Sequence, residues 1–177
     1  MADFRFFNIV HNGRDEYYTP RYAIRPILKY IRPGAKVWCP FDRDESKFVS
    51  ELKKHGCTVI NTHIDYGQDF FEIDVPDCDY IVSNPPYSVK YEVFDRLFKI
   101  GKPFAMLVGV VGLFESKRYR LFKQHRVEVL YMSKRVNYSS NYEENATSIN
   151  PPFSSVYLCS GMLPNQIEYA DITKELK

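Results

Sequence analysis

Short apolar runs alternate with amphipathic stretches along this chain, and this alternation restricts the fold more than any other feature. The apolar runs cover residues 36–39, 57–62, 79–83, 103–113, 127–138 and 154–161. Helical apolar spacing marks the stretches 20–31, 44–56, 89–101 and 116–126, and Pro26 is expected to start or interrupt the first of these. Strands separated by helices of this length form βαβ units, so we expect an α/β fold with a mostly parallel, doubly wound sheet.

The carboxyl-terminal part of the chain departs from this alternation. No helical pattern separates the runs 127–138 and 154–161, so one of these two strands is expected to be antiparallel. The polar stretch 139–152 between them is expected to be a loop on the substrate side of the sheet. With 177 residues and 45% hydrophobic content, the chain is expected to form one domain around one core.

The overall composition excludes several classes of protein. A formal net charge of +2 does not indicate a polyanion-binding protein, so a nucleic-acid surface would have to come from local clustering of charge. No run approaches the roughly 20 apolar residues that cross a bilayer, and we expect a soluble, cytoplasmic protein. The four cysteines form no CxxC pair, so we expect reduced thiols and no metal site.

The run 79–83 ends abruptly in the tetrapeptide Asn84, Pro85, Pro86, Tyr87. In open α/β sheets, ligands bind beyond the carboxyl ends of the strands. The Asn84 side-chain oxygen and the Pro85 carbonyl can accept both hydrogens of an exocyclic amino group, and the Tyr87 ring can stack on the attached base. Two acceptors favour a more tetrahedral nitrogen whose lone pair points at an electrophile. The alternative is a rigid strand-to-loop turn with no ligand.

This tetrapeptide resembles the catalytic motif of the S-adenosylmethionine-dependent amino methyltransferases, chiefly those acting on adenine N6 in nucleic acid. The order of elements over residues 15–160 is also similar, although enzymes that methylate a glutamine amide share the motif. The resemblance implies a class I methyltransferase fold, S-adenosylmethionine as cofactor, and a catalytic role for residues 84–87. Because residues 63–78 leave little room for the usual second helix and third strand, we expect a compressed sheet.

The resemblance also implies a set of residues that bind the methyl donor: Tyr17, Thr19, Pro20, Cys39, Pro40, Phe41, Asp42, Asp65, Asp69 and Phe70. A Thr-Pro pair before a helix lies near the donor's carboxylate in this family. Thr19 is alternatively a helix cap with Pro20 at the first helical position.

The loop after residues 36–39 departs from the family pattern. Cys39 stands where the family has an acid, and Asp42 and Arg43 replace its glycines. A loop with so few glycines approaches a ligand less closely. We expect Asp42 or Asp44 to supply the negative charge for the donor's ammonium group, or else to cap the following helix.

Two acids in the stretch 63–78 complete the implied donor site. In the family, an acid after the second strand holds the ribose hydroxyls, and an acid followed by an aromatic residue faces the donor's adenine. Asp65 matches the first and Asp69 with Phe70 the second. The alternative is that both are solvated loop carboxylates.

Residues 116–135 carry seven positive charges against one negative charge. Lys117, Arg118, Arg120, Lys134 and Arg135 are the predicted substrate-binding residues, with Tyr119 and Tyr131 adding stacking surface. The alternative is a solvated helix face. A second motif of this kind, Asn150–Phe153, follows a polar stretch and is expected to form a rigid edge of the substrate-side loop or an entry into the next strand.

We therefore expect methyl transfer from S-adenosylmethionine to adenine N6 in DNA or RNA, with the base flipped or unpaired. No separate target-recognition domain is evident, so specificity is expected to be low, supplied by a protein partner, or directed at structured RNA. The alternatives are a protein glutamine-amide methyltransferase and a non-catalytic binding protein with a degenerate donor loop.

Overall fold

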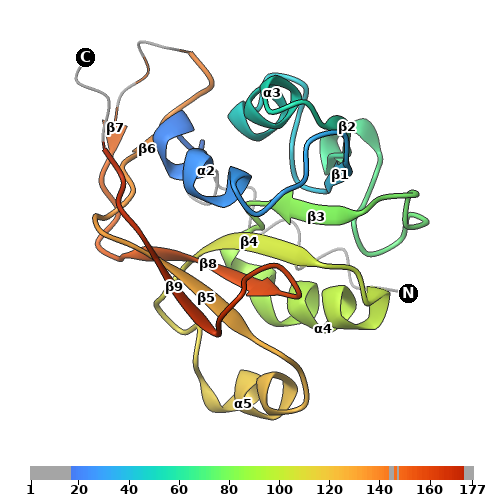
Figure 1. Cartoon of the computed structure of the whole chain (residues 1–177), viewed down its shortest axis with the longest axis vertical. Coiled ribbons are helices and arrows are strands. Elements are labelled where there is room, and N and C mark those ends of the chain that lie inside the picture. The colour runs from blue at the N-terminus through green and yellow to red at the C-terminus, as the bar shows by residue number, and fades with distance from the viewer. Residues whose placement is uncertain (1–16, 144–145, 147, 174–177) are drawn as a thin grey trace.

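A seven-stranded sheet runs through the computed structural model, which describes residues 17–143, 146 and 148–173 (Figure 1). The strand order is β2-β1-β3-β4-β8-β5-β9. The strands are β1 (Lys36–Cys39), β2 (Thr58–Asn61), β3 (Tyr80–Ser83), β4 (Phe104–Gly109), β5 (Glu128–Met132), β8 (Ser155–Ser160) and β9 (Ile167–Ala170).

Strand directions confirm the predicted mixed sheet. β2, β1, β3 and β4 are parallel neighbours, whereas β8 is antiparallel to both β4 and β5. The predicted antiparallel strand is therefore β8, which lies between two strands that precede it in sequence. β9 pairs parallel to β5 and was not predicted, because its four residues alternate in polarity at the sheet edge and form no apolar run.

The predicted compression of the sheet is also confirmed. Only a short 3₁₀ helix, η1 (Ile64–Tyr66), interrupts the connection from β2 to β3 among the described residues. β3 therefore pairs directly with β1, and the edge on this side is β2.

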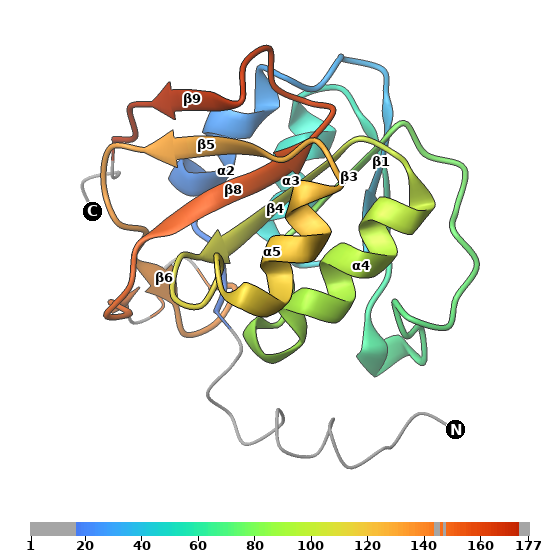
Figure 2. The same ribbon diagram turned by 90° about the horizontal axis from the view of Figure 1, so that it is seen from below.

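Helices cover both faces of the sheet (Figure 2). α2 (Arg21–Leu28) and α3 (Lys47–Lys54) pack on one face, where Ile24, Ile27 and Leu52 are fully buried. α4 (Lys90–Ile100) and α5 (Ser116–Lys123) pack on the other, around Phe94 and Leu97. The two apolar clusters confirm the predicted doubly wound α/β fold.

Three predicted elements differ from the structure. The expected strand 103–113 ends at Gly109 and is followed by a turn. The expected strand 127–138 divides into β5 and β6 (Tyr138–Ser139), and β6 pairs with β7 (Ser148–Ile149) inside the predicted polar loop. Apolar content alone does not mark where a strand leaves its neighbours.

Pro26 lies inside α2 and neither starts nor interrupts it. The helix ends at Leu28, so Pro26 falls in its last turn and removes a single backbone donor. Within the described part of the chain, no helix combines the length and apolar character needed to span a membrane.

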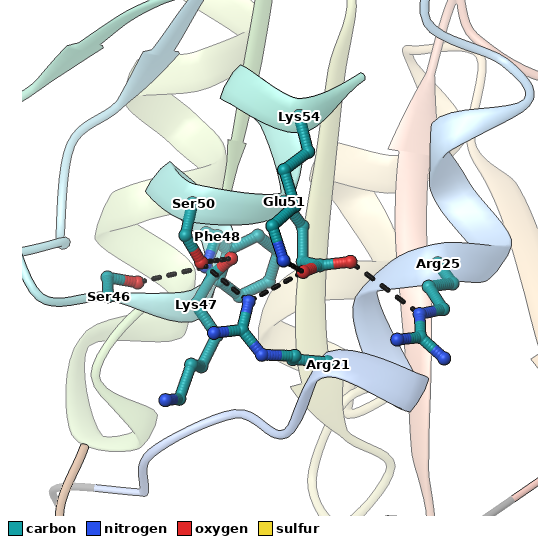
Figure 3. A network of polar contacts seen from close by, with 8 residues as sticks. All are labelled: Arg21, Arg25, Ser46, Lys47, Phe48, Ser50, Glu51 and Lys54. Carbon is teal, nitrogen blue, oxygen red and sulfur yellow. Dashed lines mark hydrogen bonds and ion pairs between the residues drawn. The ribbon is translucent and has the colours of Figure 1, made fainter. Parts of the chain in front are cut away.

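A buried carboxylate joins α2 to α3 (Figure 3). Glu51 is 6% exposed and accepts a hydrogen bond of 2.6 Å from Arg21, while Arg25 and Lys54 lie 3.6 and 3.5 Å away. Burial raises the pKa of Glu51, but the hydrogen bond from Arg21 and the three positive charges outweigh it, so the net pKa is lowered. The α2–α3 contact therefore depends on an ionised Glu51.

Glu51→Gln is expected to lower the free energy of unfolding by about 1–2 kcal/mol, because it removes the charge that the arginines face in a buried position. Urea titration at pH 7 measures this loss. Arg25→Ala is the matched control, since its longer and more exposed pair predicts a loss below about 0.5 kcal/mol. Equal losses in the two variants would contradict a special role for the buried carboxylate.

Candidate functional site

Asn84 directly follows β3, and hydrogen bonds fix the orientation of its side chain. Its Nδ2 donates to the backbone oxygen of Tyr17 at 3.2 Å and to the Thr19 hydroxyl at 3.3 Å. Its Oδ1 is buried and has no hydrogen-bond partner among the described residues. Turning the amide over would place two oxygens face to face at Tyr17, so the free atom is the oxygen acceptor.

The segment 17–19 reaches Asn84 because it pairs with a distant part of the chain. Tyr18 forms an antiparallel bridge with Ser139, with N···O distances of 3.3 and 2.9 Å. α2 begins at Arg21, and its N-cap residue Pro20 provides no side-chain cap. The buried Thr19 hydroxyl binds Asn84, so the alternative of Thr19 as the helix cap is wrong.

Four rings gather beside Asn84, and we call Tyr17, Tyr87, Tyr138 and Phe153 the aromatic cluster. The Tyr87 ring lies 5.2 Å from both Tyr17 and Phe153, and its hydroxyl donates to that of Tyr138 at 3.3 Å. Burial raises the pKa of Tyr138 to about 12 and that of Tyr87 further. Both phenols are therefore neutral at pH 7 and act through stacking and hydrogen bonding.

Gly109, the last residue of β4, makes room for these rings. A Cβ atom at this position would lie 2.8 Å from the Phe153 ring and 3.0 Å from that of Tyr87. Phe153 was predicted to form an edge of the substrate-side loop or an entry into a strand; it lies two residues before β8, and its ring packs within the cluster. The signal available in sequence was its position after a second Pro-Pro pair, as in the first motif.

A buried lysine that sequence reasoning missed lies beneath Tyr87. Lys90 is 5% exposed, and its Nζ donates to the carbonyls of Gly109 at 3.1 Å and Val111 at 3.2 Å. The same nitrogen lies 4.8 Å from the centroid of the Tyr87 ring. Lys90 thus ties the chain after β4 to the turn that carries Tyr87.

Asp42 connects the loop after β1 to the end of β3, directly before Asn84. It is 5% exposed, and its carboxylate accepts hydrogen bonds from the hydroxyls of Ser46 and Ser83. Ser46 caps α3 by accepting from the Phe48 amide at 3.1 Å, and Ser83 directly precedes Asn84. Burial raises the pKa of Asp42 to about 6, although both hydroxyls lower it.

The other predicted donor-loop residues lie at the carboxyl ends of β1 and β2. Cys39 and Pro40 are buried, and burial raises the pKa of the Cys39 thiol, so Cys39 supplies no negative charge. Arg43 pairs with Asp65 at 2.6 Å. Among the described residues, no three His, Cys, Asp or Glu side chains gather where a metal ion could bind.

Phe70 is a core residue in this structure. It is 3% exposed and packs against Trp38, Phe41 and the Arg96 guanidinium. The Asp69 carboxylate accepts from the Phe71 amide at 2.9 Å and so closes a local turn. Phe41 is only half-buried, so it offers more free ring surface than Phe70.

Residues 116–135, which carry the excess of positive charge, do not form one continuous basic surface. Lys117 pairs with Glu92 at 3.3 Å, and Arg118 pairs with Glu115 at 3.6 Å. Exposed cations in this segment include Arg120, Lys123 and Lys134. Arg126 instead binds the fully buried Glu128 at 2.5 Å. Lys134 and Arg135 follow the carboxyl end of β5, but Arg126 precedes its amino end, so the sheet separates them.

Comparisons with known proteins assign the chain to no family. No family model and no curated protein matches it. Among solved structures, a precorrin-6y C5,15-methyltransferase from Geobacter metallireducens GS-15 matches with 13% identity and a TM-score of 0.44. The match covers 84% of this chain and 96% of that chain. A similarity this low does not bear on the reaction or the substrate.

The raised pKa of Asp42 predicts a pH dependence of stability. The folded state binds this proton more tightly than the unfolded chain, so the Asp42 contribution falls as pH rises from about 4 to about 6. Asp42→Asn removes the titration. The free energy of unfolding of Asp42→Asn minus that of wild type should increase by on the order of 2–3 kcal/mol over that pH range. Urea titration at several pH values measures this difference. A constant difference would contradict the burial effect.

Gly109→Ala is expected to lower the free energy of unfolding by about 1–3 kcal/mol, because its Cβ displaces two packed rings. The destabilisation caused by Gly109→Ala should be smaller by about 1 kcal/mol or more when Phe153→Ala is also present. Thermal unfolding of the two single variants and the double variant measures this coupling. Additive losses would mean that the rings do not restrict this position.

Proposed function

We propose that this protein transfers a methyl group from S-adenosylmethionine to the N6 amino group of adenine in DNA or RNA. The observation that carries the proposal is the Asn84 amide, whose nitrogen is held by Tyr17 and Thr19 while its buried oxygen has no partner among the described residues. A buried acceptor without a donor is costly, and a ligand amino group would satisfy it.

The residues of the turn would orient that amine. Asn84 Oδ1 and the Pro85 carbonyl would accept its two hydrogens, and Pro86 would keep the turn rigid. The nitrogen lone pair would then point away from both acceptors, toward the electrophile. Because Tyr87 and Tyr138 hold their protons well above neutral pH, neither serves as a general base. The amine proton would leave to solvent after transfer.

The aromatic cluster favours a planar base over a glutamine side chain. The Tyr87 ring contacts those of Tyr17 and Phe153, which also contact each other, and stacking on such rings contributes about 1–3 kcal/mol per base. A glutamine amide has no aromatic face to gain from these contacts. The rings therefore support a nucleobase as the substrate.

S-adenosylmethionine, when bound, supplies a methyl group on a positively charged sulfur. The chemistry of the residues at the carboxyl ends of β1, β2 and β3 fits this group. The Phe41 ring suits its adenine, and the Asp65 carboxylate, 41% exposed, suits its hydroxyls. Asp42, ionised above about pH 6, suits its ammonium. The other residues of the proposed donor site are Tyr17, Thr19, Pro20, Pro40 and Asp69, whereas Cys39 and Phe70 lie in the apolar cores.

Exposed positive charges near the same edge of the sheet would contact phosphates. Arg120 lies on α5, and Lys134 and Arg135 follow β5, whose carboxyl end shares an edge with that of β4. Phosphate contacts raise affinity without reading sequence. A protein glutamine substrate gives these charges no purpose.

Asn84→Ala is expected to lower methyl transfer at least about 100-fold, because it removes the side-chain acceptor that orients the amine. The donor's dissociation constant should change by less than about threefold. Labelled S-adenosylmethionine with DNA, RNA and protein pools measures transfer, and calorimetry measures donor binding. Asn165→Ala, at an exposed asparagine before β9, is the matched control and should keep full activity.

The distribution of label among the DNA, RNA and protein pools distinguishes the proposed function from its alternatives. Label in protein alone would replace the proposed function with amide methylation. Absence of donor binding by calorimetry would favour a non-catalytic binding protein. Equal transfer by Asn84→Ala and wild type would reject the assigned role of Asn84.

A further inference from the structure

Residues 110–115, which we call the β4–α5 loop, present apolar side chains to solvent beside the proposed site. Val111 is 68% exposed and Phe114 is 64% exposed, and Tyr119 on the first turns of α5 is 60% exposed. Figure 2 shows this loop leaving the carboxyl end of β4. Grouped exposed apolar side chains of this kind mark a surface that another molecule covers.

Several contacts hold the loop in place from beneath. Lys90 donates to the Val111 carbonyl at 3.2 Å, and the Val110 amide donates to Ser154 at 2.9 Å. Leu113 is fully buried, and its amide closes a turn on Val110 at 3.1 Å. The backbone is thus anchored on both sides of Val111, while the side chains of Val111 and Phe114 remain outside.

The conformation of the turn requires glycine at position 112. Its φ is +68°, a conformation that favours glycine, and a Cβ there would lie 2.7 Å from the Glu115 carboxylate. A turn specified at this level presents Val111 and Phe114 at defined positions. Phe114 also contacts Phe122 of α5, with ring centroids 6.3 Å apart.

The loop lies next to the ring that would stack on the target base. The Lys90 ammonium that binds Val111 is 4.8 Å from the centroid of Tyr87. A base bound against Tyr87 leaves a gap in the stack it came from, and apolar wedges commonly fill such gaps.

The charges around the loop fit a nucleic-acid strand. Arg120 and Lys123 follow on α5 and are exposed, as is Lys117, which also pairs with Glu92 at 3.3 Å. Lys123 lies 5.7 Å from the ring of Tyr119, so cations and rings alternate along this surface. Phosphates would meet the cations while bases meet the apolar side chains.

We propose that the β4–α5 loop enters the base stack of a nucleic-acid duplex beside the target adenine, with Phe114 as the inserting side chain and Val111 supporting it. This inference rests on the proposed function, because it assumes that the adenine is turned out of a duplex. Phe114 would lower the cost of opening the duplex and would matter little for a strand that is already single.

Binding alone tests the wedge without any methyl transfer. Fluorescence anisotropy compares an intact DNA duplex with the same duplex carrying one abasic site, where the stack is already open. Wild type should bind the abasic duplex about tenfold more tightly. Phe114→Ala should lose this preference, and Tyr169→Ala, at another exposed aromatic residue on β9, should keep it. An RNA duplex of the same sequence shows which nucleic acid is preferred.

Methyl transfer supplies the second test. Phe114→Ala should lower transfer to native DNA about tenfold and transfer to the same DNA after heat denaturation by less than about threefold. Equal losses on both forms, or no loss on either, would overturn the wedge. The wedge would also be overturned if wild type showed no preference for the abasic duplex. An unchanged preference in Phe114→Ala would overturn it too, and would indicate that the exposed surface binds a protein partner.

Failure of the wedge and failure of the proposed function give different results. If wild type transfers no methyl group to any nucleic acid, the proposed function fails, and the abasic-site preference still decides whether Phe114 inserts into a duplex. If transfer occurs and depends on Asn84 but not on Phe114, the proposed function stands and the wedge is wrong.

Discussion

The two hydrogen bonds that Asn84 donates are the interaction on which the candidate site depends. They consume both hydrogens of the amide nitrogen, so the oxygen has a fixed direction and stays available. They also join the segment 17–19 to the end of β3. A turn of two prolines can make the backbone rigid, but it cannot orient the asparagine side chain, and Tyr17 and Thr19 do that.

Side-chain hydrogen bonds hold the loop after β1 against the neighbouring strands. Asp42 binds Ser83 and Ser46, its amide donates to Thr62 at 3.2 Å, and Asn61 donates to Asp44 at 2.8 Å. The loop is therefore attached to the ends of both β2 and β3. A buried carboxylate with a pKa near 6 costs stability, and it connects the proposed donor side to the proposed acceptor side of the site.

Around Tyr87, packing and polar contacts act together. Lys90 and Gly109 set the space beneath the ring, and Tyr17 and Phe153 set its sides. In this arrangement, ring–ring contacts hold the position that a base would take, so base binding must exchange one set of stacking contacts for another. The β4–α5 loop lies on the same support, because Lys90 binds both Tyr87 and the Val111 carbonyl.

The sequence by itself determined the layered α/β fold, the antiparallel strand and the position of Asn84 at a strand end, because these follow from local periodicity and chain length. The compressed sheet followed from the short stretch 63–78 set against the family pattern that the sequence resembles. The sequence did not reveal β9, the early end of β4, the core position of Phe70 or the pairing of Asp65 with Arg43. Those depend on partners distant in sequence. The tertiary structure alone decided that Tyr17, Thr19, Tyr138 and Phe153 meet near Asn84. Hydrogen bonds and ring contacts between residues as distant in sequence as Tyr17 and Phe153 produce no periodic pattern in the chain.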